Sequence, residues 1–529
     1  MSVDPILTPG ETCWRVDRAD QFACIIDAAD YFRHAKAAML RAQHRIVLVG
    51  WDFDARTPFE RGATTLPGPN QLGAFLQWIV WKRPALEIYL LKSNLKLLPA
   101  FDDFWFGVTP VSLMNRISSK RLHLAIDPAH PVGSVHHQKI VVVDDSFALC
   151  GGLDFTLDRW DTPEHADDDE TRKIGGRTHG PRHEVGLGVD GAAARALGEH
   201  ARDRWEWATG QQLEEIEARH VVWPRDLSPT LPDVDVAIAR TLPTFEDRDE
   251  VREVEALNLA AIAAARDTIY LENQYLASRR LAEALAERLR EPDGPEIVVV
   301  LPRSSESRLE QESMDSARQL LLHLLWEADE HGRFGVYWPV TDGGTPVYVH
   351  SKVMVIDDRL LRIGSSNLNN RSMGFDSECD VALEVEPGSD REDDVRREIS
   401  TLRNRLVTEH LGVPVAEFSD ELALNGSFLT TVETLRSSGR TLRPFTGRTV
   451  ADEGSPLAEN DLMDPDHVPK SLTRSFARLI EGLTERRFRP ASVGVELAKG
   501  GLEPVPGSDD VQQPDGDEDD GEVRTRSST

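Results

Sequence analysis

Short apolar segments alternate with amphipathic stretches along most of the chain. The short segments are rich in valine, isoleucine and leucine, as is typical of buried strands, and they cover residues 45–51, 87–92, 135–143, 268–273, 296–301 and 347–356. The amphipathic stretches have apolar residues at helical spacing and predict helices at 21–43, 72–81, 191–207, 251–265, 281–290 and 313–331. Strands that alternate with helices predict an α/β fold class.

The order of these elements in the first part of the chain is repeated in the second. We therefore predict two pseudo-symmetric α/β halves, each a mixed sheet flanked by helices, with one shared active site at their interface. The predicted divisions are a first half at 1–225, a proline-rich linker at 226–250, a second half at 251–412, a helical appendage at 413–500 and a disordered acidic tail at 501–529. The tail has too few apolar residues to fold.

The pattern His-x-Lys-x-x-x-x-Asp occurs once in each half. The first copy consists of His137, Lys139 and Asp144, and the second of His350, Lys352 and Asp357. Each copy is followed by a small-residue turn, Gly151-Gly152-Leu153-Asp154 in the first half and Gly364-Ser365-Ser366-Asn367 in the second. One copy alone is typical of an exposed surface pair, but two copies with matching turns indicate a duplicated catalytic unit.

The spacing within each copy explains the chemistry that we expect. Residues two apart on a strand point to the same side, so each half offers one imidazole and one ammonium group together. Two such halves suit a phosphodiester, because the lysines neutralise its oxygens while one histidine attacks and the other transfers protons. We expect the turns to let the backbone approach the anion. We expect Asp144 and Asp357 to form turns that support the site, without contact to phosphorus.

These residues resemble the phospholipase D superfamily, and more narrowly its lipid-hydrolysing branch. The resemblance covers about residues 40–412 and includes 50–54, 151–162, 269–275 and 370–378. It implies a mechanism without metal or cofactor, in two steps through a phosphohistidine, with His137 as the nucleophile. The matching turn residues implied to bind substrate are Gly152, Asp154, Ser365 and Asn367.

Members of this superfamily use an acid outside each motif to orient each histidine. Glu184 stands where relatives usually show aspartate in Trp-His-Asp-Val, Arg182 replaces that tryptophan, and Glu378 is the counterpart in the second half. A carboxylate bonded to one ring nitrogen fixes the tautomer and raises the basicity of the other. The alternative for either glutamate is a surface salt bridge.

Composition limits the possible partners and compartment. The net charge of −30, without a basic stripe, argues against nucleic acid. We expect a cytoplasmic protein with peripheral contact to a membrane surface, because no basic apolar leader and no run of about 18 apolar residues is found. The four cysteines lack metal-ligand spacing. The acidic residues 167–170 suit a solvated loop better than a cation site.

The sequence therefore predicts a phosphodiesterase acting on phospholipids, with water or an alcohol as acceptor. Hydrolysis would give phosphatidic acid. The first alternative is a phosphatidyltransferase of the cardiolipin-synthase type, which would use a lipid alcohol. The second is an inactive scaffold that binds phosphate groups, although such a scaffold would need the lysines and not both His137 and His350.

Overall fold

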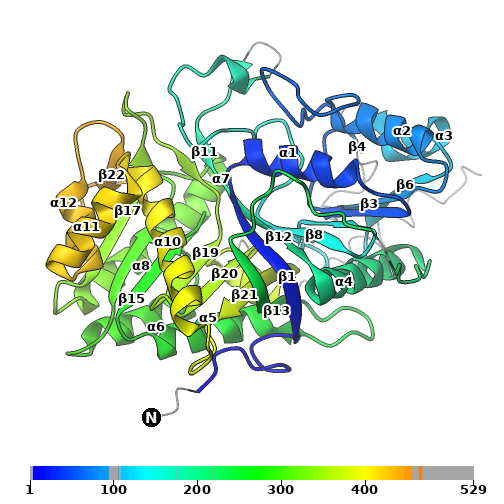
Figure 1. Cartoon of the computed structure of the whole chain (residues 1–529). Helices are drawn as coiled ribbons and strands as arrows, with labels where there is room; N and C mark the ends of the chain where they lie inside the picture. Colours follow the sequence, from blue (N-terminus) through cyan, green and yellow to red (C-terminus); the bar gives the residue numbers. More distant parts are fainter. Residues whose placement is uncertain are drawn as a thin grey trace, which may run out of the picture. The chain divides into compact units, whose positions relative to one another are not determined.

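The computed structural model describes residues 4–94, 105–106, 109–174, 177–217, 220–454 and 464–467. Within them, one sheet of 16 strands runs through both halves (Figure 1). The first half supplies, in spatial order, β6 (Leu122–Asp127), β3 (Glu87–Ser93), β2 (Arg45–Gly50), β7 (Ile140–Val143), β8 (Phe147–Gly151), β12 (Val185–Asp190) and β1 (Arg15–Ile26). The second half supplies β17 (Phe334–Val340), β16 (Glu296–Val300), β15 (Thr268–Glu272), β19 (Val353–Ile356), β20 (Leu360–Gly364), β21 (Glu378–Glu384) and β13 (Leu231–Leu242).

The two series have the same pairing pattern. β2 pairs parallel with β3 and antiparallel with β7, while β15 pairs parallel with β16 and antiparallel with β19. The series meet at an antiparallel pairing of β1 with β13. The predicted α/β class with two matching halves is confirmed.

Helices cover both faces of the sheet. They are needed on both because successive side chains of β2 are apolar and point to opposite faces. Ile46 and Leu48 pack into one hydrophobic core, and Val47 and Val49 into another on the opposite face. In the first half α1 (Ala28–Met39) and α2 (Leu72–Lys82) cover one face and α4 (Gly191–Thr209) the other (Figure 1). In the second half one face carries α5 (Glu253–Ala264), α6 (Arg279–Arg290) and α8 (Ser316–Ala328), and the other carries α10 (Glu392–Leu411), α11 (Val415–Asn425) and α12 (Phe428–Leu435).

The predicted helix at 21–43 is wrong at its start. Residues up to Ile26 belong to β1, and Asp27, with a φ of 64°, separates this strand from α1. Phe22 and Cys24 face one core while Ala23 and Ile25 face another. Because the strand is buried on both faces, its apolar run lacks the polar alternation that identifies an exposed strand.

Two other predicted boundaries need correction. The segment 226–250 is more than a linker, because it contains β13, which pairs with β1 and β21 in the middle of the sheet. The segment 413–500 includes α11 and α12, but also β22 (Thr441–Pro444), which extends the sheet beside β17. Both strands obtain their partners from distant parts of the chain. The predicted tail at 501–529 lies outside the described residues.

Shorter elements complete the described part of the chain. They are α3 (Val111–Ile117), α7 (Arg308–Glu310), α9 (Asn370–Gly374), the pairs β4 (Trp105–Phe106) with β5 (Thr109–Pro110), β9 (Lys173–Ile174) with β10 (Arg177–Thr178) and β11 (Arg182–His183) with β18 (Tyr348–Val349), and β14 (Val251–Arg252) beside β13. None of the helices in the described ranges is both long and apolar enough to cross a membrane.

Candidate active site

The two motifs lie at equivalent places in the two halves. His137 and Lys139 immediately precede β7, and His350 and Lys352 lie between β18 and β19, so the motif segments lie outside the regular strands predicted for them. Each following strand turns back through a hairpin, from β7 to β8 and from β19 to β20. These hairpins fix the motif segments to the centre of each half-sheet.

The two motif aspartates occupy these hairpin turns. Asp144 and Asp357 both have a φ of 51°. The carboxylate of Asp144 accepts hydrogen bonds from the backbone N–H groups of residues 43–45, at the start of β2. That of Asp357 accepts three from residues 266–268, at the start of β15. Each carboxylate therefore ties its motif hairpin to the neighbouring strand.

The acids that contact the histidines cross between the halves. Nδ1 of His350 lies 2.8 Å from Oε2 of Glu184, which belongs to the first half. Nδ1 of His137 lies 3.1 Å from Oε2 of Glu378, which belongs to the second half. Both glutamates are buried. Because Nδ1 of each ring is engaged, Nε2 is the atom of each histidine that can meet a substrate.

The lysines are anchored in matching ways. Nζ of Lys139 donates to the carbonyl of His137 at 2.7 Å and lies 3.2 Å from the carboxylate of Asp154. Nζ of Lys352 donates to the carbonyl of His350 at 2.6 Å and to the side chain of Gln274 at 3.2 Å. Both ammonium groups are thus fixed beside the histidine of their own motif.

The small-residue turns allow the halves to pack closely. A Cβ on Gly152 would lie 3.1 Å from Cδ of Lys352 and 3.2 Å from the carbonyl oxygen of His350. In the other turn, the Ser365 carbonyl lies 3.1 Å from Nδ1 of His137, and the Ser365 hydroxyl donates to Glu378 at 2.5 Å. Gly152 therefore makes room for the opposite motif, and Ser365 helps to hold the opposite histidine.

A cavity of about 400 Å³ lies between the halves. Among the predicted site residues, its lining contains His137, Asp154, His350, Asn367 and Glu378. Its lining also includes residues to which the sequence analysis gave no role, namely Trp51, Arg159, Gln274, Tyr275, Glu306, Glu310 and Arg371. Several of these belong to the family-like stretches at 50–54, 151–162, 269–275 and 370–378. The resemblance in these stretches was the signal that could have identified them as site residues.

Burial and the neighbouring cations control protonation in the cavity. Burial, together with the charges of Lys139 and Lys352, holds the pKa of His137 well below its usual value. Burial and Lys352 likewise lower the pKa of His350. Burial raises the pKa of Glu378 to about 8, against hydrogen bonds from two serines and the charge of Lys139. A neutral imidazole at His137 is the form that can act as a nucleophile.

Glu184 is held next to the unusual Arg182. Burial raises the pKa of Glu184 to about 7, although Arg159, Arg182 and Lys352 oppose this shift. The guanidinium of Arg182 stacks on the ring of Tyr348, 4.6 Å from its centroid, and forms an ion pair with Glu306. Arg182 therefore links β11 to β18 of the other half through its contact with Tyr348.

The acidic segment 167–170 forms hydrogen bonds with other residues of the protein. The carboxylate of Asp167 accepts hydrogen bonds from the backbone of Gly343 and the hydroxyl of Thr345, both at 2.7 Å. Asp169 accepts a hydrogen bond from the N–H of Thr171 at 2.7 Å. The loop is thus joined to the second half.

Known proteins resemble the chain at low identity. A family model described as the PLD-like domain of cardiolipin synthase matches residues 259–399. Phospholipase D1 of Schizosaccharomyces pombe is 23% identical over 517 residues, which cover 76% of this chain and 37% of that protein. Phospholipase D delta of Arabidopsis thaliana is 22% identical over 563 residues, covering 74% of this chain and 65% of that protein. A solved phosphatidylserine synthase of Haemophilus influenzae has a TM-score of 0.48 at 11% identity, covering 88% of this chain and 94% of that one.

The two halves and their paired motifs define a duplicated α/β protein with one composite centre. Each half supplies a histidine, a lysine and the acid that contacts the opposite histidine. The matched PLD-like domain and the phospholipase D relatives support a place for the chain in the phospholipase D superfamily. The chain spans little more than a third of the length of the Schizosaccharomyces pombe relative.

Proposed function

We propose that the chain is a phospholipase D-type phosphodiesterase that cleaves or transfers the phosphatidyl group of glycerophospholipids. The observation that carries this proposal is the crossed arrangement, in which Glu378 contacts His137 and Glu184 contacts His350 beside one cavity. This arrangement supports a single phosphodiester between the Nε2 atoms of two histidines that line the cavity, with the two lysines anchored behind them. No resident cofactor is part of the proposal.

The reaction would proceed in two steps. Nε2 of His137 attacks phosphorus and forms a nitrogen–phosphorus bond, while the bond from phosphorus to the head-group oxygen breaks and that oxygen takes the proton from Nε2 of His350 in its protonated form, a strong acid because its pKa is lowered. His350 then takes a proton from water or an alcohol, whose oxygen attacks phosphorus as the bond to His137 breaks. Lys139 and Lys352 hold the non-bridging oxygens in both steps. Water yields phosphatidic acid, and an alcohol yields a new phosphodiester.

A second candidate differs only in the acceptor. The matched family model for 259–399 carries the name of cardiolipin synthase, which favours a phosphatidyltransferase that uses a lipid alcohol. The two candidates share the first step and separate in the second. The inactive scaffold remains the alternative without turnover.

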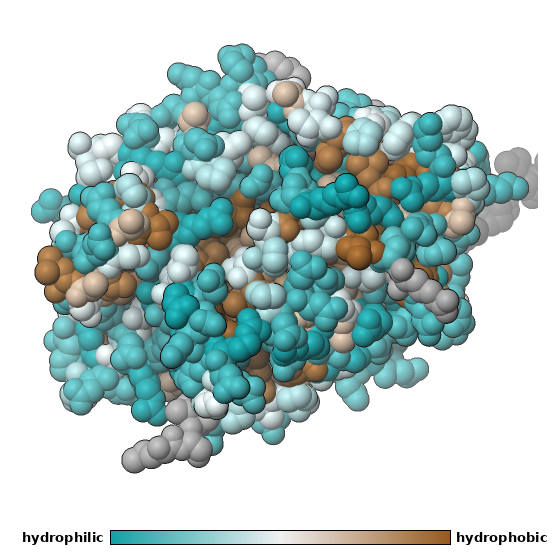
Figure 2. Space-filling model, in the orientation of Figure 1, coloured by the Kyte–Doolittle hydropathy of each residue, from teal (hydrophilic) through white to brown (hydrophobic). Residues whose placement is uncertain are grey.

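We also propose that the substrate is met at a membrane surface. Leu113 and Ile117 on α3 and Trp81 on α2 expose 45%, 67% and 71% of their surface, respectively. Figure 2 shows hydrophobic residues among the polar surface on the side of α2 and α3. Partly exposed apolar side chains of this kind insert into the interfacial region of a bilayer. We propose no contact with nucleic acid.

The test is a panel of phospholipids incubated with the full chain, with and without a primary alcohol or a lipid alcohol. We expect head-group release, with phosphatidic acid in water and a transfer product when an alcohol is present. His137→Asn and His350→Asn should abolish release, whereas His331→Asn, on an exposed histidine, should not. Transfer only to the lipid alcohol would support the second candidate. Lipid binding without release would support the scaffold.

The membrane contact has its own test. Ile117→Ser should weaken binding to phospholipid vesicles, measured by sedimentation. Leu424→Ser is the matched control, because Leu424 is 81% exposed but lies on α11 in the second half. Equal losses for both variants, or no loss for Ile117→Ser, would contradict contact through α3.

A further inference from the structure

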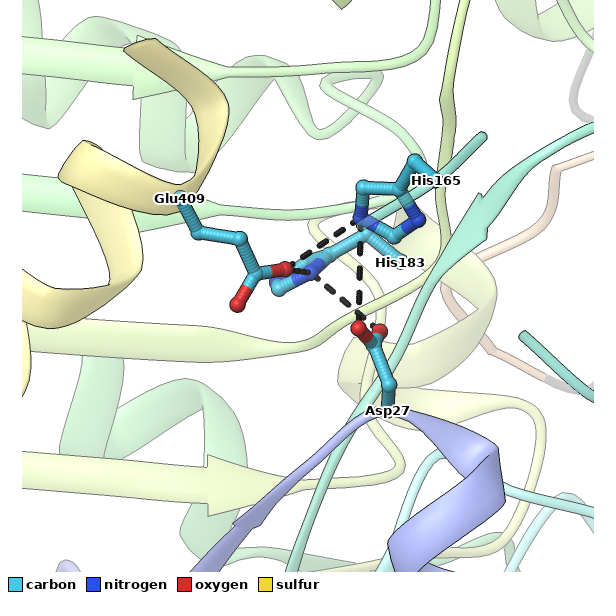
Figure 3. Close-up of side chains that lie close together, drawn as sticks. All are labelled: Asp27, His165, His183 and Glu409. Atoms are coloured by element: carbon cyan, nitrogen blue, oxygen red, sulfur yellow. Dashed lines mark hydrogen bonds and ion pairs between the residues drawn. The ribbon is translucent and has the colours of Figure 1, made fainter. Parts of the chain in front are cut away.

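Outside the cavity lining, two histidines and two acids form a cluster in which all residues but the partly buried Glu409 are buried. Figure 3 shows Asp27, His165, His183 and Glu409 pointing toward one another. Asp27 lies between β1 and α1, His165 in the loop after β8, His183 in β11 and Glu409 near the end of α10. One ligand atom of each lies within 4.8 Å of those of the other three. The cluster therefore joins four separate segments of the chain.

The distances within the cluster fit a small cation. Oε1 of Glu409 lies 2.8 Å from Nδ1 of His183 and 3.2 Å from Nε2 of His165. Oδ1 of Asp27 lies 3.5 Å from Nδ1 of His183, and Oδ2 of Asp27 lies 3.9 Å from Nε2 of His165. A tetrahedral zinc ion with bonds of about 2.0–2.1 Å places its ligand atoms about 3.3 Å apart. The four distances lie around this value.

The far side of each imidazole is already engaged by another carboxylate. Nδ1 of His165 lies 2.9 Å from Asp161, and Nε2 of His183 lies 3.0 Å from Glu272. With the outer nitrogens held in this way, the inward nitrogen of each ring faces Glu409 and can bind either a proton or a metal ion. Metal-binding histidines commonly have this outer carboxylate, which fixes the tautomer.

One buried carboxylate oxygen of the cluster has no hydrogen-bond donor in the described part of the chain, and its nearest cationic group there is Nε2 of His165 at 3.9 Å. Oδ2 of Asp27 is buried and has no hydrogen-bond partner among the described residues, while Oδ1 accepts a hydrogen bond from the N–H of Glu184 at 3.1 Å. The whole Asp27 residue is 1% exposed. A buried carboxylate oxygen without a donor is costly, and a bound cation would satisfy it.

We propose that Asp27, His165, His183 and Glu409 bind one divalent transition-metal ion, and that this ion is zinc. Two imidazole nitrogens and two carboxylate oxygens form a donor set that suits zinc better than calcium or magnesium, which favour oxygen ligands alone. Four protein ligands in a buried position describe a closed structural site. The ion takes no part at phosphorus, so the reaction proposed above needs no metal in its cavity.

The metal site would stabilise the backbone that carries the catalytic pair. The N–H of Asp27 donates to the carbonyl of Glu184 at 2.7 Å, and the N–H of His350 donates to the carbonyl of His183 at 2.9 Å. Two of the proposed ligands, Asp27 and His183, are thus joined by backbone hydrogen bonds to Glu184 and His350. Loss of the ion should loosen these segments as well as lower stability.

Metal analysis of the full chain tests the proposal without any activity assay. Protein produced with zinc in the medium should contain about one zinc ion per chain by mass spectrometry. Asp27→Asn and His165→Ala should each lose most of this metal, whereas His331→Ala, on an exposed histidine, should retain it. Replacement with cobalt should give the visible absorption of a tetrahedral site in the parent chain only.

Two results would overturn the proposal. One is a chain that contains no metal and takes up neither zinc nor cobalt when refolded in their presence, which would mean that protonated imidazoles hold the carboxylates. The other is full metal content in both Asp27→Asn and His165→Ala, which would place the metal elsewhere. Asp27→Asn keeps the shape of the side chain, so loss of metal in a variant with an unchanged circular dichroism spectrum identifies a ligand.

Discussion

The crossed acids predict that each glutamate affects the chemistry of the histidine from the opposite half. Glu378→Gln replaces a carboxylate 3.1 Å from Nδ1 of His137 with a neutral amide of the same shape. Above pH 8, where Glu378 is ionised, its hydrogen bond with His137 involves a charged group and contributes about 1.5–3 kcal/mol, and its loss in the transition state corresponds to roughly a 10- to 150-fold lower rate. We expect Glu378→Gln to slow formation of the phosphohistidine by this factor.

The assay uses two substrates with different leaving groups. A phosphodiester of p-nitrophenol releases a leaving group that needs no protonation, so its first step depends on the nucleophile and not on the acid. Glu184→Gln, which acts through His350, should therefore keep a normal burst of p-nitrophenolate but turn over natural phospholipid slowly. Glu378→Gln should show a slow burst with both substrates.

Matched catalytic variants make the assignment falsifiable. His137→Ala should reproduce the Glu378→Gln defect in stronger form, and His350→Ala should reproduce that of Glu184→Gln. A slow burst in Glu184→Gln together with a normal burst in Glu378→Gln would reverse the assigned roles of the histidines. Normal kinetics in both glutamine variants would refute any orienting role for the crossed carboxylates.

Three further predictions concern packing, stability and pH. Gly152→Ala should lower turnover, because its Cβ would press against the second motif, whereas Gly180→Ala, with no atom within 4 Å, should be neutral in the same assay. Asp357→Ala should lower the free energy of unfolding, measured by urea denaturation, by about 2–4 kcal/mol, because three backbone N–H groups lose a charged acceptor. The control Asp293→Ala, at an exposed position, should lower it by less than about 0.5 kcal/mol. Since the pKa of His137 is lowered, its neutral form persists as pH falls through 6.5. In the double variant Glu184→Gln/Glu378→Gln, which lacks the carboxyl groups with pKa values of about 7 and 8, an acid limb of kcat/KM at or above pH 6.5 would contradict this.

The sequence by itself determined the features that are encoded locally. Apolar periodicity identified α2, α4 and α6, because each buries one face of a single helix. The repeated motif located both histidines and both lysines, and the turn preference of aspartate placed Asp144 and Asp357 in hairpins. None of these inferences needed knowledge of distant contacts.

The tertiary structure alone decided which distant residues meet. Glu378 lies 241 residues from His137, and Glu184 lies 166 residues from His350, so their crossing depends on how the two half-sheets join. That junction is β1 paired with β13, two strands that were predicted as part of a helix and part of a linker. The His165 and His183 cluster also arises only after α10 brings Glu409 beside the first half. Pairing between distant strands depends on register and burial across the whole sheet, which local sequence patterns do not specify.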